Sequence, residues 1–225
     1  YQGRSLDELA QVCKLYKLKA TKADGSRLSA ATLRNRIRYL TSACRHAWRE
    51  HGLCAHDPAA SVTVPAVRNE RHIYGTRADM LAACRQCRNK KARMAIRIAF
   101  YSGMRLGEIL RAKVRGNTWV LADTKNGSPR IVPIHPKVAV CARRFTPCPK
   151  ITIQRAWEGA RDRAGLHGMH FHDWRHSAAS ALVNAGVDLY TVGRILGHKD
   201  SRSTARYSHL AVDTLAAAVR RIGLN

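Results

Sequence analysis

A large excess of positive charge is the feature that most constrains this chain. Its 225 residues include 40 Lys and Arg but only 15 Asp and Glu, which gives a formal net charge of +25. Charge of one sign repels itself in a compact state unless a polyanion neutralises it. Hydrophobic residues still make up 45% of the chain, enough for a buried core in one or two domains. We therefore expect a folded protein with a basic surface and a nucleic acid as its partner.

The apolar runs and the cysteines point to a location inside the cell. No apolar run approaches the roughly 18 residues that a membrane span needs, and no segment has the pattern of a signal peptide. These features predict a cytoplasmic protein without a membrane partner. Seven cysteines, an odd number, argue against a disulfide framework. We expect most of them to be small core residues.

Two groups of side chains raise the alternative of a bound metal ion. Cys84 and Cys87 form a C-x-x-C that Cys141 and Cys148 could complete as a four-sulfur zinc site. The second spacing is unlike that of a zinc knuckle, and the first pair falls in a run typical of a helix. Four histidines also lie close together in the sequence: His167, His170, His172 and His176. Contact with DNA or solvent is the more common role for such side chains, so we predict no metal ion and no cofactor.

Helical periodicity dominates the N-terminal part. A capping box at Ser5 to Glu8 predicts a helix toward Leu15. A longer helix is predicted from about Ser29 to His51, because apolar residues recur there every three or four positions. Another face of this second helix carries four arginines: Arg34, Arg38, Arg45 and Arg49. Such a stripe is usually only a solvated face, but the net charge of this chain shifts the prediction toward contact with DNA phosphates.

The stretch 66–75 lacks clear periodicity and is the predicted linker between two domains, residues 1–65 and 76–225. After it, Thr76 with Asp79 three residues on predicts the start of a helix, and helical patterns continue to about residue 100. The periodicity then changes to two. The fold class we expect is mostly α with a small antiparallel β-sheet (α+β).

The change of period predicts a β-hairpin. Runs 118–124 and 130–134 alternate in the manner of strands, and the Asn126-Gly127 between them is the strongest short hairpin signal. Lys125 would therefore stand at the hairpin tip, where a lysine is more often a solvated turn residue.

Caps predict the helices that follow. We expect one helix from about His172 to Asn184 and a second from its cap at Asp188 to Gly197. Ser201 can cap a further short helix that carries Tyr207.

Beyond that short helix, a last amphipathic helix is predicted from six positions: Leu210, Thr214, Leu215, Ala218, Val219 and Ile222. We expect it to pack either on its own domain or on a neighbouring protomer.

Six polar residues stand in an order that suits the breaking of a phosphodiester: Arg105, Lys125, His172, Arg175, His198 and Tyr207. That reaction needs a nucleophile, positive charge on the non-bridging oxygens and a proton for the leaving oxygen. His172 and Arg175 are three apart and share a helix face, while His198 and Tyr207 follow after 23 and 9 more positions.

This order resembles the signature of the tyrosine recombinases, the family of phage integrases and Xer-type resolvases, over roughly residues 66–212. The resemblance implies that Arg105 and Arg175 bind the phosphate and that Tyr207 attacks it, forming a 3′-phosphotyrosyl link without a metal ion or ATP. Glu108, three residues after Arg105, would hold its basic neighbours in place.

The remaining catalytic positions are also filled. The resemblance implies that His172 accepts the proton of the tyrosine and that His198 donates a hydrogen bond to the phosphate. Lys125 would protonate the departing 5′ oxygen as a general acid.

The resemblance also predicts the partners. We expect double-stranded DNA, a homo-tetramer on DNA with a monomer in its absence, and accessory DNA-bending proteins. The catalytic domain would follow a helical core-binding domain, of which residues 1–65 resemble only the later helices, so we expect that domain to be N-terminally truncated. The function expected is that of a site-specific recombinase, as in an integrase of a phage or mobile element. A type IB topoisomerase and a DNA-binding module that does not cut remain the alternatives.

Overall fold

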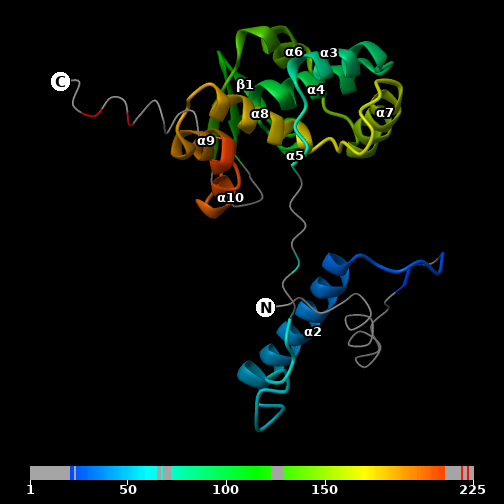
Figure 1. Ribbon diagram of the computed structural model, residues 1–225, viewed down its shortest axis with the longest axis vertical. Helices are drawn as coiled ribbons and strands as arrows, with labels where there is room; N and C mark the ends of the chain where they lie inside the picture. The colour runs from blue at the N-terminus through cyan, green and yellow to red at the C-terminus, as the bar shows by residue number, and fades with distance from the viewer. Residues whose placement is uncertain are drawn as a thin grey trace. The chain divides into compact units, whose positions relative to one another are not determined.

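The computed structural model describes residues 21–22, 24–64, 67, 72–122, 129–210, 219 and 222. The chain divides into two compact units, residues 1–71 and residues 72–225 (Figure 1). Each unit is described by itself below. The capping box predicted at Ser5 lies outside the described residues.

The described part of unit 1 contains one long helix, α2 (Ala30–His51). The Ser29 side chain accepts a hydrogen bond from the Thr32 backbone N–H, and Gly52 ends the helix with a φ of 60°, a left-handed conformation that glycine adopts without strain. Leu33 and Ile37 are buried in a small core. The predicted helix from Ser29 to His51 is confirmed.

Two arginines of the α2 stripe bind the chain that follows this helix. Arg45 Nε lies 3.0 Å from Asp57 Oδ2, and its Nη2 donates to the Ala59 carbonyl at 3.3 Å. Arg34 Nη1 donates to the Val67 carbonyl at 3.2 Å. These two guanidinium groups therefore have structural partners within unit 1, whereas Arg38 and Arg49 are exposed.

Unit 2 combines helices with one small sheet. Within the described residues its elements are α3 (Arg77–Gln86), α4 (Lys90–Ser102), α5 (Leu106–Ile109), β1 (Lys113–Arg115), β2 (Thr118–Leu121), β3 (Arg130–Pro133), η1 (Pro136–Val138), α6 (Ala139–Arg144), α7 (Lys150–Arg163), α8 (Asp173–Asn184), α9 (Leu189–Leu196), α10 (Arg202–Ala205) and η2 (Ser208–Leu210). The predicted class, mostly α with a small antiparallel sheet, is confirmed.

The sheet is antiparallel in the order β1-β2-β3. Trp119 on β2 lies opposite Val132 on β3, and both side chains are buried. The two strands predicted on either side of Asn126-Gly127 are thus present, although both are shorter than predicted. The turn itself, residues 123–128 with Lys125, lies outside the described residues.

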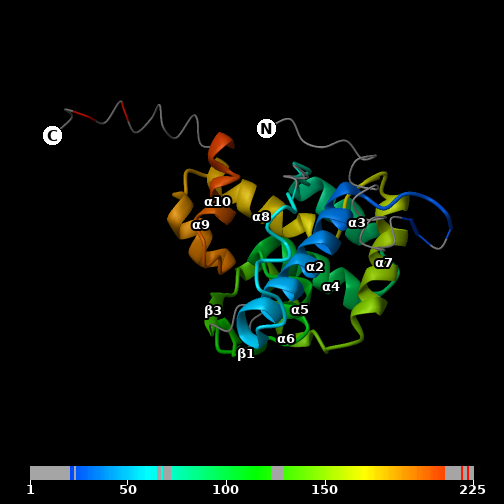
Figure 2. The same ribbon diagram turned by 90° about the horizontal axis from the view of Figure 1, so that it is seen from below.

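Helix α8 connects two parts of unit 2. It packs against α4 and against α9 (Figures 1 and 2). Its Trp174 is fully buried, with ring centroids 5.4 Å from Trp157 of α7 and 6.0 Å from Phe100 of α4. The aromatic core therefore fixes α8, and with it every polar side chain that α8 presents to its neighbours.

Caps explain most helix boundaries of unit 2. Thr76 and Asp79 form the capping box of α3, Asp188 caps α9 and Gly197 ends it, all as predicted. Ser201 makes no capping hydrogen bond to α10, and that helix ends at Ala205. Tyr207 therefore lies in the turn after α10, because Tyr207 N–H bonds back to Thr204 O and closes a tight turn.

The end of the predicted linker packs on unit 2. The Gly75 backbone N–H donates to Ser177 Oγ of α8 at 2.8 Å, and the rings of His72 and His209 lie 5.5 Å apart, edge to face. The assignment of residues 1–65 as a core-binding domain stays a prediction. Of the predicted C-terminal helix, the structure describes only Leu210, Val219 and Ile222. Among the described residues, no helix has the length and apolar character needed to cross a membrane.

Gly103, which ends α4, offers a test of the packing between α4 and α9. Its φ is 63°, and a Cβ added there would lie 2.5 Å from Leu196 Cδ2. We expect Gly103→Ala to lower the free energy of unfolding by roughly 2 to 4 kcal/mol, from left-handed strain and overpacking together. The measurement is denaturant unfolding followed by tryptophan fluorescence.

Gly116→Ala is the matched control. Gly116 has a φ of 56° but no heavy atom within 4 Å of an added Cβ, so this variant should lose only about 1 to 2 kcal/mol. Equal losses in the two variants would contradict the argument that Gly103 is required for close approach to α9.

Candidate active site

A buried carboxylate, Glu108, gathers arginines from different elements. Arg105 makes two hydrogen bonds to Glu108, each 2.9 Å long. Its backbone N–H donates to Oε2, and its side-chain Nη1 donates to Oε1. Arg130 Nη2 donates to Oε2 at 2.7 Å. Arg175 Nη1 lies 3.9 Å from the same oxygen. Because three guanidinium groups face one carboxylate, 3 − 1 leaves a net charge of +2 at this point.

The charge state of Glu108 follows from these contacts. Its side chain is only 2% exposed, and burial acts to raise the pKa of the carboxyl. The Arg105 N–H and the charge of Arg130 act the other way and outweigh burial, so the pKa of Glu108 lies below its usual value. Glu108 is therefore ionised at neutral pH.

Arg175 is held by the ends of two helices. Its Nη1 donates to the Gly103 carbonyl and its Nη2 to the Leu196 carbonyl, each at 2.7 Å. Carbonyls at helix C-termini lack intrahelical partners and carry partial negative charge. Burial, and next the charge of Arg105, lower the pKa of Arg175 to about 9. Arg175 therefore stays charged at neutral pH, although its side chain is only 3% exposed.

Arg130 is a site residue that the sequence analysis missed. It begins β3, and it donates from Nη1 to the Ile195 carbonyl at the end of α9 as well as to Glu108. Its side chain is 13% exposed, whereas the neighbouring Ile131 is 66% exposed. The alternation of the strand could have identified it, because Arg130 shares a face with the buried Val132. A charge on a buried face needs a partner of opposite charge.

Tyr207 is buried, with 1% of its surface exposed. Its hydroxyl oxygen lies 2.6 Å from Nδ1 of His176. Burial raises the pKa of Tyr207 to about 12, although the charges of Arg206 and Arg175 oppose the rise. In this structure Tyr207 is thus a protonated phenol.

The hydrogen-bond partner of Tyr207 differs from our expectation. The predicted proton acceptor was His172, but His176, one helical turn later, makes the contact. His172 stands at the start of α8, where its ring meets that of His176 edge-on with centroids 5.0 Å apart. The residue as a whole is exposed, yet partial burial and the charges of Arg175 and Arg105 lower the pKa of its imidazole.

His198 follows the end of α9 and is oriented by a threonine. Its Nδ1 lies 2.7 Å from Oγ1 of Thr204, which is 4% exposed. Burial, together with the charges of Arg175 and Arg105, lowers the pKa of His198 to about 4. Gly193 makes room for this contact, since a Cβ there would lie 2.9 Å from Thr204 Oγ1. His198 is therefore neutral at physiological pH.

A hollow adjoins these side chains. It has a volume of about 780 Å³, and its lining includes Glu108, Arg130, Arg194, His198 and Lys199. The rest of the lining is mainly apolar and includes Ile131, Val132 and Ile195, so the cations that could attract an anionic ligand are limited to a few side chains.

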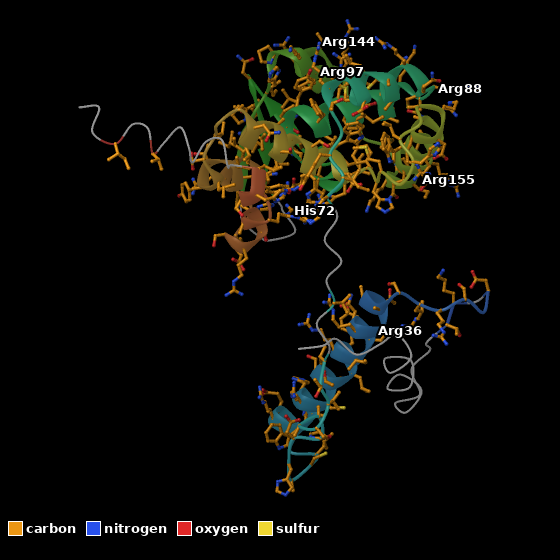
Figure 3. The ribbon with its side chains drawn as sticks, in the orientation of Figure 1. Arg36, His72, Arg88, Arg97, Arg144 and Arg155 are labelled. Carbon is orange, nitrogen blue, oxygen red and sulfur yellow. The ribbon has the colours of Figure 1, made fainter. Side chains whose placement is uncertain are left out.

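Further basic side chains lie on the outside of unit 2, as Figure 3 shows for the exposed Arg88, Arg144 and Arg155. They come from the turn after α3, from α6 and from α7. The positive charge of the chain is thus spread over the surface, as well as gathered in the site.

Cys84 and Cys87, considered above as metal ligands, have other contacts. Burial raises the pKa of Cys84 to about 12, and its Sγ faces the Met80 sulfur and the Arg93 carbonyl. Cys87 Sγ faces the Asn89 carbonyl. Within the described ranges, no group of three or more His, Cys, Asp or Glu side chains is arranged to hold a metal ion.

Comparison with known proteins assigns the family. The model of the phage integrase family matches residues 135–213. The shufflon-specific DNA recombinase of Escherichia coli is 28% identical over 206 residues, which is 83% of this chain and 53% of that protein. Tyrosine recombinase XerA of Saccharolobus solfataricus is 24% identical over 214 residues, or 88% of this chain and 70% of that protein. The chain belongs to the tyrosine recombinase family.

The fold of this tyrosine recombinase has a solved counterpart. A lambda integrase tetramer bound to a Holliday junction matches with a TM-score of 0.64 and 18% identity, covering 89% of this chain and 66% of that one. The chain spans little more than half the length of the shufflon recombinase. The family membership and the fold are therefore established, and the activity is taken up below as a proposal.

Glu108→Gln tests the arginine cluster of this tyrosine recombinase. The change keeps the shape of the side chain but leaves three cations without their counter-charge, so we expect the free energy of unfolding at pH 7 to fall by about 3 kcal/mol. The folded-state pKa of Glu108 lies below its unfolded value. Its contribution is therefore present above about pH 4.5 and is lost as the pH falls through the folded-state pKa.

The difference between wild type and variant should accordingly shrink in acid. Urea unfolding at a series of pH values measures both effects. Asp162→Asn is the control, because Asp162 pairs with Arg161 at 2.7 Å but is 52% exposed, and should change stability by less than about 1 kcal/mol. A variant as stable as the wild type at pH 7 would contradict the assignment of Glu108 as the counter-charge.

Proposed function

We propose that this tyrosine recombinase cleaves and rejoins double-stranded DNA at specific sites through a 3′-phosphotyrosyl link to Tyr207. The observation that carries the proposal is the arginine cluster at Glu108, whose net charge of +2 favours the binding of an anion. The same unit contains a tyrosine hydroxyl that is hydrogen-bonded to a neutral imidazole. The name of the shufflon-specific DNA recombinase supports recombination as the reaction.

Arg105 and Arg175 are the proposed phosphate ligands. A guanidinium group offers a planar fork of donors that fits two phosphate oxygens. Arg175 is supported by two helix-end carbonyls, so its remaining donors have a fixed direction before DNA arrives. A donor that is positioned in advance for the developing negative charge lowers the activation free energy by about 3 to 4 kcal/mol.

His198 is the proposed third donor to the phosphate. For this role the proton of the neutral imidazole must be on Nε2, so Nδ1 must be a hydrogen-bond acceptor. The Thr204 hydroxyl, 2.7 Å from Nδ1, can supply that hydrogen bond and thereby select the tautomer. Thr204 is then a positioning residue for His198.

Lys125 is the proposed general acid for the leaving 5′ oxygen. Its loop joins β2 to β3, and Arg130 anchors the first residue of β3 to Glu108 and to α9. This anchoring supports a role for the loop beside the phosphate. The phosphotyrosyl link conserves the energy of the broken bond, so rejoining by a 5′ hydroxyl needs neither ATP nor a metal ion.

Unit 1 is proposed to contribute DNA contacts as the core-binding domain, with Arg38 and Arg49 as phosphate ligands. Both are exposed and border a hollow of about 600 Å³ on α2. Arg34 and Arg45, named with them from the sequence, already bind groups of their own unit, and for them DNA contact is the weaker proposal.

The proposed assembly is a homo-tetramer on DNA, because strand exchange joins four active sites. The tetramer of lambda integrase on a Holliday junction supports this arrangement. A monomer without DNA, accessory DNA-bending proteins and a cytoplasmic location remain predictions from the sequence. The relatives are recombinases by name, which favours recombination over a type IB topoisomerase or a module that does not cut.

Tyr207→Phe tests the nucleophile. The wild-type chain is incubated with a pool of labelled, nicked duplexes whose core sequence is randomised, and covalent adducts are recovered on a denaturing gel. We expect the wild type to form adducts, with and without EDTA, and the variant to form none, because only the phenol oxygen can attack phosphorus. The adducts recovered also identify the preferred DNA sequence.

Three results would count against this proposal. Adducts that persist in Tyr207→Phe would exclude Tyr207 as the nucleophile. Loss of activity in EDTA would contradict a mechanism based on arginines alone. Relaxation of supercoiled plasmid without any sequence preference among the recovered adducts would favour the topoisomerase.

Thr204→Val tests the orientation of His198. Valine has the shape of threonine but cannot donate to Nδ1, so we expect the rate of adduct formation to fall about tenfold, the equivalent of one hydrogen bond. Thr204→Ser keeps the hydroxyl and should retain most of the rate. Equal rates in the valine variant and the wild type would remove Thr204 from this role.

A further inference from the structure

Arg130, which is not among the six residues predicted as catalytic, makes contacts with several parts of the site. Its side chain is 13% exposed, and the residue is held in the sheet by pairing with Leu121 of β2. Its Nη2 donates to Glu108 Oε2 at 2.7 Å, and its Nη1 donates to the Ile195 carbonyl in the last turn of α9. One guanidinium group therefore ties β3 both to the carboxylate of the arginine cluster and to α9.

The same side chain packs on the turn that leads to His198. Gly197 ends α9 with a φ of 68°, and a Cβ added there would lie 2.8 Å from both Cδ and Nε of Arg130. Because hydrogen bonds hold both terminal nitrogens of this arginine, a Cβ would displace it. His198 is the next residue, and its backbone N–H donates to the Gly193 carbonyl at 2.9 Å. Arg130 thus lies against the backbone from which the His198 side chain projects.

Arg130 and Arg175 hold neighbouring carbonyls of one helix end. Arg130 binds the Ile195 carbonyl, and Arg175 Nη2 donates to the Leu196 carbonyl at 2.7 Å. Both also face the same oxygen, Glu108 Oε2, with N···O distances of 2.7 and 3.9 Å. A guanidinium group carries its donors in a rigid plane and can bridge two acceptors, which a single ammonium cannot do with the same geometry. The end of α9 is therefore fixed relative to the arginine cluster.

We propose that Arg130 is a positioning residue for the reaction at the phosphodiester: it fixes the end of α9 and so directs His198 and Arg175 toward the phosphate. This role rests on the proposed function. Arg130 acts through these two side chains, because each of its own terminal nitrogens already donates to an acceptor of the protein. Donors stabilise developing charge best when their direction is set before the substrate binds.

Arg130→Lys separates the geometry of this side chain from its charge. Lysine keeps a cation beside Glu108, but its ammonium cannot bridge the carboxylate and the Ile195 carbonyl as the planar group does. We expect the single-turnover rate of adduct formation to fall about 10²-fold, measured on a duplex recovered from the randomised pool. The dissociation constant for the same duplex should change less than about threefold, because many phosphate contacts share the binding energy.

Arg115→Lys is the matched control. Arg115 is an exposed arginine on β1 of the same sheet, and this variant should react at the wild-type rate. Urea unfolding of both variants establishes that they are folded under the conditions of the assay.

Gly197→Ala disturbs the same contact from the other partner. The added Cβ pushes against Arg130, so we expect the rate to fall as it does in Arg130→Lys. Gly186→Ala is its control, because Gly186 has a φ of 81° and no heavy atom within 4 Å of an added Cβ. It introduces comparable backbone strain and should leave the rate unchanged.

Coupling to His198 distinguishes positioning from a general loss of structure. If Arg130 acts partly through His198, a variant without that imidazole has less to lose when Arg130 is changed. The loss of rate caused by Arg130→Lys should therefore be at least about fivefold smaller in a His198→Ala background than in the wild type.

NMR titration of His198 tests the contact without any DNA. Burial, and then the charges of Arg175, Arg105 and Arg130, lower the pKa of His198 to about 4. Arg130→Gln removes one of these cations together with the support of the turn, so the pKa of His198 should rise. Arg115→Gln should leave it unchanged.

An Arg130→Lys rate within about threefold of the wild type would overturn the proposal. Losses that multiply in full in the double variant would overturn it too, as would an unchanged His198 pKa in Arg130→Gln. Absence of any wild-type adduct would instead overturn the proposed function, and the role of Arg130 in the reaction with it.

Discussion

The ionised Glu108 carboxylate is the interaction on which the rest of the site depends. Guanidinium groups from three different elements meet around it: Arg105 before α5, Arg130 on β3 and Arg175 on α8. Two unit charges 4 Å apart interact by about 4 kcal/mol where the effective dielectric constant is 20. Without the carboxylate, the arginines would therefore repel one another. With it, the cluster stays together and still has positive charge left for a phosphate.

Helix ends supply the second constraint. The last carbonyls of α9 accept hydrogen bonds from Arg130 and Arg175, and the carbonyl of Gly103, which ends α4, accepts another from Arg175. These carbonyls would otherwise be unsatisfied in a buried place. One set of contacts thus completes the helices and orients the arginines. The aromatic core around Trp174 holds α8 at the position where both conditions are met.

The resting site keeps its proposed nucleophile in the protonated, unreactive state. Tyr207 is buried and protonated, and the imidazoles of His176 and His198 are neutral because burial and nearby arginines disfavour a second positive charge. The same arginines would be neutralised in part by a bound phosphodiester. The electrostatics of the site therefore make the activation of Tyr207 depend on a bound anion.

The sequence by itself determined what depends on neighbouring residues. Caps at Thr76 and Asp188 placed two helices correctly, apolar periodicity placed the helix that ends at His51, and the change to period two placed both strands, because these signals act over about four positions. The sequence also gave the order of the six proposed catalytic residues, of which Lys125 lies outside the described residues.

Only the tertiary structure decided which side chains meet. It paired Tyr207 with His176 instead of His172, across 31 residues, and Arg130 with Glu108, across 22. It also gave Arg45 of the predicted DNA-binding stripe a partner at Asp57. His172 and His176 differ by one helical turn, and helical spacing alone places both on related faces of α8. The choice between them depends on how the segment after α10 packs on α8, a long-range contact that no local pattern contains.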